Sequence, residues 1–505
     1  MRRLGLLGAV LLALAVVAAF AWSAKPAVTR SAVAAGQVTA VTSVTRSCPP
    51  AEPGTGKTRI AMIAVPSQAA SAKSSTVTSG GSATLSAVPP AVASPAVAKP
   101  AKSAASGTST AKSAPAGKSA IATPVTVSVP GAATTVTAPG TDDSGTALAV
   151  TGQMAEGFEA EQANSAGTGL VSCSHPGSDM WFVGSGEPEV RLYLMNTGTL
   201  AASANVNILT DTGQQDGLAN AITVAPNQVI EENVAPLVRG AQAIAMEVQT
   251  SSGQVAASVW EGDAQGAGTW LPQSAEPSTT LVIPGLTVAS SAARLFVTVP
   301  GQTDARVKVV AYTPAGAFQQ FATVPVQASA GATTPVTLSS LGASAAGLEL
   351  TSNVPIVAGV LVPGAGVGSF TTAVAPIAEQ GVVAGNPAAR GLTVGLLLTA
   401  PGAAATASVS VVSADGTVTS PADLQNVTVG ARRTLAVAVP RPSGRQPFAI
   451  VLTPGADSGP LYAARVVTSG SGGLSAPVAS LLPVQSALTE ITLPPVQNSY
   501  TAVLP

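Results

Sequence analysis

The stretch Arg191-Leu-Tyr-Leu-Met-Asn-Thr-Gly198 has two relatives further along the chain, Arg294-Leu-Phe-Val-Thr-Val-Pro-Gly301 and Gly395-Leu-Leu-Leu-Thr-Ala-Pro-Gly402. The spacings are 103 and 101 residues. Each copy is typical of a short β-strand that enters a turn, and about ten residues later a second strand ends in a hairpin glycine. A supersecondary pattern that returns at a fixed spacing indicates repeated structural units.

Two further landmarks keep the same spacing. The runs 246–250, 348–351 and 450–453 lie 102 residues apart, and the glycine-ended runs 180–184, 281–285 and 382–385 mark the joins. A weaker first copy is found at 58–66, 124–129 and 147–152. We therefore predict four units: unit one at 58–178, unit two at 179–280, unit three at 281–381 and unit four at 382–505.

Seven or eight short strands per unit, with turn signals every 8 to 12 residues, favour tandem Ig-like β-sandwiches of about 100 residues each. The alternative is a β-propeller, because each unit could also be cut into two four-stranded blades. Both alternatives make the chain all-β. Residues 67–120 consist almost wholly of Ala, Ser, Lys, Pro, Gly and Thr, which predicts a low-complexity insertion that builds no core.

Composition narrows the function classes. Of the 505 residues only 9% are charged and 3% aromatic, whereas Gly and Pro supply 50 and 40 positions. An ordinary cytosolic enzyme carries roughly 25% charged residues, so that class is disfavoured. The net charge is −1, and there is no basic stripe with interleaved aromatics, so a nucleic-acid partner is not expected.

The N-terminus carries the strongest local signal. Arg2 and Arg3 precede an uninterrupted apolar run over 4–22, which is long enough to cross a bilayer as one helix. We expect it to anchor the chain in the cell membrane, with residues 25–57 as a tether and everything beyond 24 extracytoplasmic. The alternatives are a signal peptide cut near Ala21, in an Ala-x-Ala sequence, and a buried core helix.

The two cysteines, Cys48 and Cys173, are the only pair in the chain. On the oxidising side of a membrane we expect them to form a disulfide, with two free thiols as the alternative. A bridge that closes a loop of this length stabilises by about 5 kcal/mol in the chain-entropy model.

Two features are similar to known binding or catalytic motifs. Ala51-Glu-Pro-Gly-Thr-Gly-Lys57-Thr58 fits a relaxed phosphate loop, but a β-type run follows it where that motif requires a helix. His175 is the single histidine, and a Ser172/His175/Asp179 triad would have no oxyanion hole by motif. We expect His175 to be a turn residue, no nucleotide to bind, and no metal or other cofactor.

Several carboxylates lie close together in sequence, namely Asp142/Asp143, Glu156/Glu159/Glu161, Glu187/Glu189, Glu231/Glu232 and Glu261/Asp263. A glycosidase needs two carboxyls about 5 to 10 Å apart beside a sugar groove. Glu261 and Asp263, between Trp260 and Trp270, are the best candidates, although solvated turn carboxylates are the simpler interpretation. Asp211 and Asp216 lack the ligand density of a calcium loop.

A family resemblance rests on the stretches 155–162, 169–173 and 181–184, with Pro176-Gly177 between the last two. The later runs 351–359 and 458–465 extend it. This Cys-x-x-Pro-Gly…Trp-Phe-Val-Gly pattern resembles an actinobacterial family of unknown function. The resemblance implies a secreted or membrane-anchored protein with tandem β repeats and supplies no catalytic residue.

The expected function is that of a non-catalytic cell-envelope protein, a scaffold or adhesion component whose partner is an envelope polymer or a membrane or envelope protein. One alternative is an enzyme acting on envelope glycan through Glu261 and Asp263. Another is an accessory subunit of a membrane glycosyltransferase or secretion complex. Burial of Trp260 and Trp270 in a core would remove the site on which the enzyme alternative depends.

Overall fold

A computed structural model describes residues 37–66, 80–91, 122–164, 167, 169–216, 218, 221–287, 293–320, 325–338, 345–364 and 367–493. The chain divides into a large compact body, 40–489, and a small one, 1–39 with 490–505. In the small body β1 (Gln37–Ala40) pairs with β36 (Glu490–Leu493). The described chain is all-β, as predicted, and its helices are short 3-10 turns: η1 (Gly152–Met154), η2 (Ala422–Leu424) and η3 (Gly473–Ser475).

Within the described ranges, no helix is long and apolar enough to span a bilayer. The predicted anchor 4–22 and the alternative cleavage site near Ala21 lie outside the described residues, as does most of the predicted insertion 67–120.

The strands of the large body fall into four successive groups, for which we keep the names units one to four. Unit one contains β2 (Ser43–Cys48), β3 (Arg59–Ile63), β4 (Ala83–Val88), β5 (Val125–Val127), β6 (Thr134–Thr137), β7 (Gly145–Thr151), β8 (Glu159–Ala163) and β9 (Val171–Ser172). Unit two contains β10 (Asp179–Gly184), β11 (Glu189–Asn196), β12 (Ala202–Thr210), β13 (Gly213–Gln215), β14 (Ile222–Val224), β15 (Gln228–Asn233), β16 (Ile244–Ser252), β17 (Ala256–Gly262) and β18 (Gly268–Leu271).

Units three and four repeat this order. Unit three contains β19 (Ser278–Leu286), β20 (Arg294–Val299), β21 (Ala305–Thr313), β22 (Gly316–Gln320), β23 (Val326–Ala328), β24 (Ala332–Thr337), β25 (Ala346–Val362) and β26 (Ser369–Thr372). Unit four contains β27 (Gly381–Asn386), β28 (Leu392–Ala400), β29 (Ala405–Val412), β30 (Val418–Thr419), β31 (Val427–Val429), β32 (Arg433–Ala438), β33 (Phe448–Pro454), β34 (Tyr462–Ser469) and β35 (Val478–Pro483).

Each unit builds two antiparallel sheets. The first sheets have the orders β2-β7-β4-β5 in unit one, β10-β16-β12-β13 in unit two and β27-β33-β29-β30 in unit four. The second sheets have the orders β6-β3-β8-β9, β15-β11-β17-β18 and β32-β28-β34-β35. In unit three the long strand β25 joins both: its first half pairs with β19 and β21, and its second half with β20 and β26.

These pairings add two strands to unit one. Residues 83–88, inside the predicted insertion, form β4, which pairs with β7 and β5 and buries Leu85. Residues 43–48, inside the predicted tether, form β2 at the edge of the same sheet. Composition concealed β4 because Leu85 and Val88 are its only large side chains, and alternating burial needs no more than that in a strand of six residues.

The composition follows from how the sheets pack. Strand β29 reads ATASVSVV and alternates buried and half-buried positions, whereas every residue of β17 and of β27 is buried. When a strand is covered on both faces, its side chains must be small enough to fit between two neighbouring sheets. Ala, Gly, Ser and Val fit that space, which accounts for the few aromatic and charged residues.

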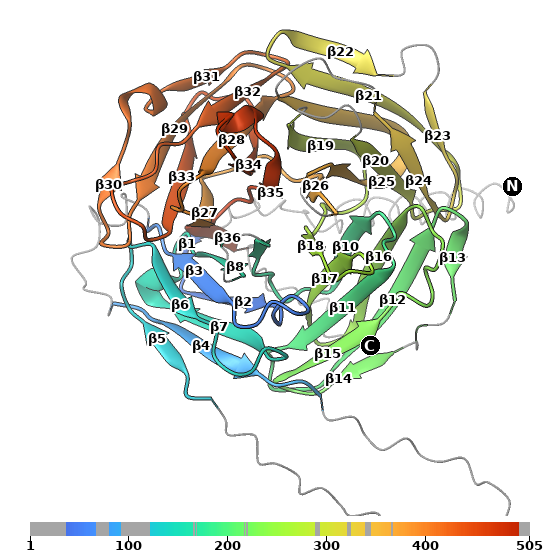
Figure 1. Ribbon diagram of the computed structural model, residues 1–505, viewed down its shortest axis with the longest axis horizontal. Helices are drawn as coiled ribbons and strands as arrows, with labels where there is room; N and C mark the ends of the chain where they lie inside the picture. The colour runs from blue at the N-terminus through green and yellow to red at the C-terminus, as the bar shows by residue number, and fades with distance from the viewer. Residues whose placement is uncertain are drawn as a thin grey trace, which may run out of the picture. The chain divides into compact units, whose positions relative to one another are not determined.

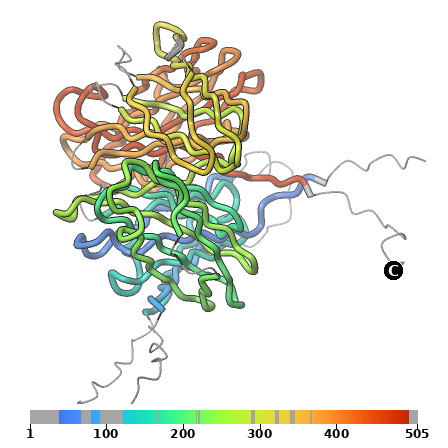
Figure 2. The backbone as a smooth tube through the Cα atoms, turned by 90° about the vertical axis from the view of Figure 1, so that its right-hand side faces the viewer, coloured from blue at the N-terminus to red at the C-terminus, as the bar shows by residue number. Residues whose placement is uncertain are grey.

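The sheets follow one another in a closed circuit. Within each unit the first and second sheets share a core, and the first sheets of units one, two and three also pack on the second sheet of the following unit. The first sheet of unit four packs on the second sheet of unit one. Figure 1 shows this circuit, with the labels of blue β3 and orange β27 near each other, and Figure 2 shows green unit two beside yellow unit three from the side.

Candidate functional site

A disulfide joins Cys48 to Cys173, as predicted. Cys48 ends β2 in the first sheet of unit one, and Cys173 follows β9 in its second sheet. The two Cα atoms are 4.3 Å apart and both side chains belong to the buried core of the unit. The bridge therefore ties together the two sheets of unit one, whose strands are separated by long connections.

A buried polar cluster adjoins the disulfide. Arg46 lies two residues before Cys48 on the same face of β2, and one of its guanidinium nitrogens contacts Nδ1 of His175. The other donates to Oε1 of Glu159 at 2.7 Å and to the carbonyl of Phe158 at 3.1 Å. This cluster was missed by sequence reasoning, because its members come from three separate segments.

The electrostatics of this cluster favour a structural role. Burial, and then the charge of Arg46, lower the pKa of His175 to about 3, so the imidazole is neutral at physiological pH. Burial raises the pKa of Glu159, and Arg46 offsets part of that effect. The Nδ1 atom that a triad carboxylate would orient faces a guanidinium instead, so the Ser172/His175/Asp179 arrangement is not formed.

A small cavity of about 40 Å³ lies beside the cluster, where units one, two and four meet. Its lining includes Glu159, His175, Ser258, Gln273 and Gln485. That space can hold one or a few ordered water molecules, with several polar partners available to each. It is too small for a sugar ring or a nucleotide.

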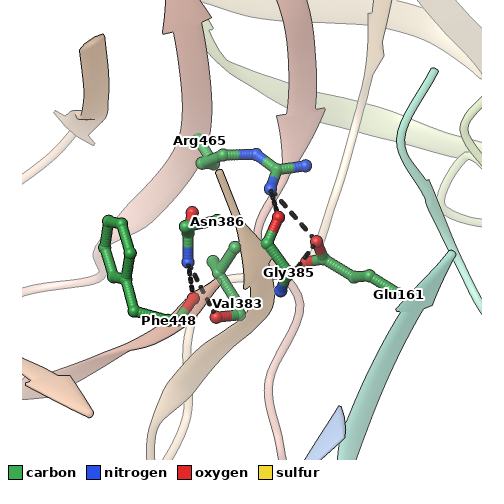
Figure 3. A network of polar contacts seen from close by, with 6 residues as sticks. All are labelled: Glu161, Val383, Gly385, Asn386, Phe448 and Arg465. Carbon is green, nitrogen blue, oxygen red and sulfur yellow. Dashed lines mark hydrogen bonds and ion pairs between the residues drawn. The ribbon is translucent and has the colours of Figure 1, made fainter. Parts of the chain in front are cut away.

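A second buried ion pair lies where unit four meets unit one (Figure 3). Nη1 of Arg465 on β34 is 3.1 Å from Oε2 of Glu161 on β8, and both residues are almost fully buried. Between them lies Gly385 on β27, whose N–H donates to Glu161 at 3.2 Å and whose carbonyl accepts from Arg465 at 3.2 Å.

A β-bulge presents Gly385 in this way. The pairing of β27 with β33 shifts between Val383 and Asn386, which frees both polar groups of Gly385 from the ladder. The side-chain amide of Asn386 donates to the carbonyls of Val383 and Phe448, at 3.1 and 3.0 Å, and holds the bulge in place. A Cβ on Gly385 would lie 3.1 Å from the Glu161 carboxylate, so glycine permits this close approach.

The proposed glycosidase pair is not assembled. Glu261 is fully buried, and its carboxylate accepts hydrogen bonds from the backbone N–H groups of Ser185 and Gly186 and from the Ser185 hydroxyl. Burial raises the pKa of Glu261 to about 7. Trp260 and Trp270 pack in the core between units one and two. Asp263 instead accepts hydrogen bonds within its own turn, so the two carboxylates line no common groove.

The phosphate-loop motif has the wrong surroundings for an anion. Residues 51–58 connect strand β2 to strand β3, so no helix N-terminus follows. Glu52 in this loop is buried with one oxygen accepting from Asn164 at 3.1 Å, and burial raises the pKa of Glu52 to about 7. An acidic group in the loop would also repel a phosphate when ionised.

The remaining acidic candidates occupy separate places. Glu231 pairs with Arg191 at 2.7 Å on the surface, and Asp211 accepts from the backbone N–H of Gln242. In the described part of the chain no group of three or more His, Cys, Asp or Glu side chains could hold a metal ion. Glu159 and Glu161, which the sequence grouped as possible catalytic carboxylates, each meet a buried arginine.

Comparison of the sequence with known proteins identifies the family of the chain. Neither the curated proteins nor the solved structures include a significant match. The profile of a family of unknown function, DUF5719, matches residues 125–440, which extend from β5 to the residues just after β32. That match covers more than half of the chain, so the protein belongs to this family of unknown function.

Proposed function

We propose that this chain is a non-catalytic protein of the cell envelope, located outside the cytoplasm and acting as a scaffold or adhesion component. Residues 4–22 would anchor it in the cell membrane, or direct its release after cleavage near Ala21. Its partner would be an envelope polymer or an envelope protein that contacts the loops of the β body.

The observation that carries this proposal is the closure of the large body on itself. The first sheet of unit four packs on the second sheet of unit one, and Arg465 meets Glu161 in that contact. Backbone hydrogen bonds add to it: Val41 donates to Thr489 at 2.9 Å and Gly157 to Leu488 at 3.0 Å. A body without free end sheets is a rigid platform on which loops keep fixed positions.

In fold terms, each unit is a two-sheet sandwich of about 100 residues, and four sandwiches join into a ring of eight sheets with the layout of a β-propeller. This combines the two architectures that the sequence left open. The same proposal includes β2 in unit one and keeps the unit boundaries at 179, 281 and 382.

Carboxylates in structural positions also support a non-catalytic role. Glu159, Glu161 and Glu261 are held by arginines or by backbone N–H groups inside the body. A glycosidase needs two carboxyls facing a shared sugar groove, and these three do not provide it.

Location and binding can be tested separately. A reporter fused after residue 57 is expected to be active only in an extracytoplasmic assay, and cytoplasmic activity would contradict the proposed location. Full-length protein extracted in mild detergent is expected to sediment with isolated envelope material and to leave its glycan uncleaved. Asp263→Asn should behave like the wild type in both assays; glycan cleavage that this variant abolishes would contradict the non-catalytic role.

A further inference from the structure

A large groove opens where the first sheet of unit four meets the second sheet of unit one. It measures about 1020 Å³ and is lined by Arg59 and Gly167 from unit one and by parts of 387–390 and 441–447 from unit four. Four of its lining residues are arginines, and no Asp or Glu is among them. The whole chain has only 23 Lys and Arg residues, so this is a marked concentration of positive charge.

The four arginines, Arg59, Arg390, Arg441 and Arg445, are exposed. Within the described ranges, the ion pairs involve other arginines: Arg46, Arg191 and Arg465. Arg441 donates to the carbonyls of Ala388 and Ala389 at 3.3 and 3.4 Å, which ties one loop of the groove to the other. The guanidinium groups of the groove therefore have charge available for a ligand.

The groove is also preorganised by proline. The connection between β32 and β33 contains Pro440, Pro442 and Pro447 on either side of Arg441 and Arg445. Proline fixes φ and lowers the entropy that a loop loses when it binds a ligand.

The molecule contains an internal comparison for this groove. The corresponding pocket between units two and three is smaller, about 430 Å³, and is lined by 185–187, 241–242, 335–337 and Arg294. Arg294 begins β20 as Arg59 begins β3, but Arg294 is the only arginine there and Glu187 lines the same pocket. The fold therefore forms this junction without a cluster of arginines.

We propose that the arginine groove binds an anionic envelope polymer that carries repeated phosphate or carboxylate groups, an inference that rests on the proposed function. A guanidinium presents a planar set of donors that matches either oxyanion in bidentate fashion. Several arginines along one groove would engage successive anions of an extended chain. No aromatic side chain lines the groove, so it offers no aromatic platform on which successive nucleobases could stack.

The test uses full-length protein in mild detergent with four probes: inorganic polyphosphate, polygalacturonate, single-stranded DNA and uncharged dextran. Wild-type protein is expected to bind polyphosphate or polygalacturonate, to lose affinity steeply as salt is raised, and to ignore dextran. Whichever polyanion binds more tightly identifies phosphate or carboxylate as the preferred group. The double variant Arg390→Ala/Arg445→Ala should bind about 100-fold more weakly, since a hydrogen bond to a charged group is worth about tenfold or more.

The matched control is Arg239→Ala/Arg306→Ala, which removes two exposed arginines elsewhere and changes net charge equally. It should stay within about twofold of wild type. Equal losses of affinity in both double variants, or no polyanion binding at all, would contradict the proposal that the groove binds a polyanion. Much tighter binding of single-stranded DNA than of polyphosphate would also overturn it.

The envelope sedimentation assay separates this inference from the proposed function. If Arg390→Ala/Arg445→Ala still sediments with envelope material, the scaffold role stands and the groove is not its binding site. If wild-type protein binds polyanions but does not sediment with envelope material, polyanion binding by the groove is supported and the proposed function is contradicted.

Discussion

Two junctions of the large body are equivalent in position and opposite in chemistry. Where units three and four meet, Gly285 sits on a bulge of β19 and approaches Leu397 and Ala464. Where units four and one meet, Gly385 sits on the corresponding bulge of β27 and approaches Ala61 and Glu161. The first junction is apolar, and the second holds a buried ion pair.

Strand register shows that the charged residues replace small or apolar ones. Glu161 faces Ala61 across the ladder as Ala464 faces Leu397, so Glu161 stands where unit four has alanine. Arg465 faces Leu396 as Val360 faces Leu295 and Val259 faces Leu192. Two other units thus place valine at the position of Arg465.

This difference has a physical reason in the chain's connectivity. Units three and four are neighbours in sequence, whereas units four and one must find each other across the whole body. A buried ion pair adds little net stability, because desolvation offsets the attraction, but it strongly penalises a mismatched partner. We infer that it favours the second sheet of unit one over the second sheets of the other units as the partner of the first sheet of unit four.

The largest expected effect is the loss of Arg465. Arg465→Val installs the residue that units two and three carry, but it leaves Glu161 buried without its cation. We expect the free energy of unfolding to fall by about 3 to 5 kcal/mol in urea denaturation. Arg239→Val, at an exposed site, is the control and should change it by less than about 0.5 kcal/mol. A loss below about 1 kcal/mol would mean that the pair is not buried as described.

Removal of the disulfide comes next. Unit one takes part in closure and is also held by Cys48–Cys173, so reduction should lower the free energy of unfolding by about 2 to 5 kcal/mol. The control is thiol titration of denatured, unreduced protein, which should find no free sulfhydryl. Two reactive sulfhydryls would show that the bridge does not form in the isolated protein.

Alanine substitutions at the two bulge glycines compare the two junctions directly. Gly285 has φ +69°, and a Cβ there would lie 2.5 Å from the Leu397 side chain, so Gly285→Ala should cost about 2 to 4 kcal/mol. Gly385→Ala should cost less, about 1 kcal/mol, because its nearest neighbour is 3.1 Å away and φ is not left-handed. Gly301→Ala, with nothing within 4 Å, serves as the control. The reverse order would contradict the assignment of the apolar junction as the tighter one.

The smallest effect concerns a buried carboxyl that has no arginine. Burial raises the pKa of Glu52 from 4.5 to about 7, so the folded state holds a proton that the unfolded state releases. Stability should therefore decrease as pH rises from about 4.5 to about 7, by about 1 to 3 kcal/mol. In Glu52→Gln this part of the slope should vanish, whereas in Asp457→Asn, at an exposed site, it should persist. An unchanged slope in Glu52→Gln would assign the pH dependence to other groups.

Local patterns were enough to predict that the described chain is all-β. The runs beginning at Arg294 and Gly395 lie in β20 and β28, and the joins ending at Gly285 and Gly385 lie in β19 and β27. These features depend on residues close in sequence, where alternation and turn glycines carry the information. The disulfide was predictable because only two cysteines exist.

The sites depend on contacts that sequence patterns do not record. Glu161 and Arg465 both lie in stretches that carry the family resemblance, yet their sequence separation of 304 residues conceals the pair. Arg46 and Glu159 are 113 residues apart, and the arginine groove joins loops of two units. Strand β4 was missed for a different reason, because its small side chains resemble the low-complexity sequence around it.

A double-mutant cycle tests the closed circuit most directly. Glu161→Ala, Arg465→Val and their combination replace the pair with residues found at the equivalent positions of other units. If the first and last units meet as described, the double variant should recover most of the loss seen in Arg465→Val, with a coupling energy of at least about 2 kcal/mol. Additivity of the two single changes within about 0.5 kcal/mol would show that Glu161 and Arg465 do not touch, and would contradict closure through this junction.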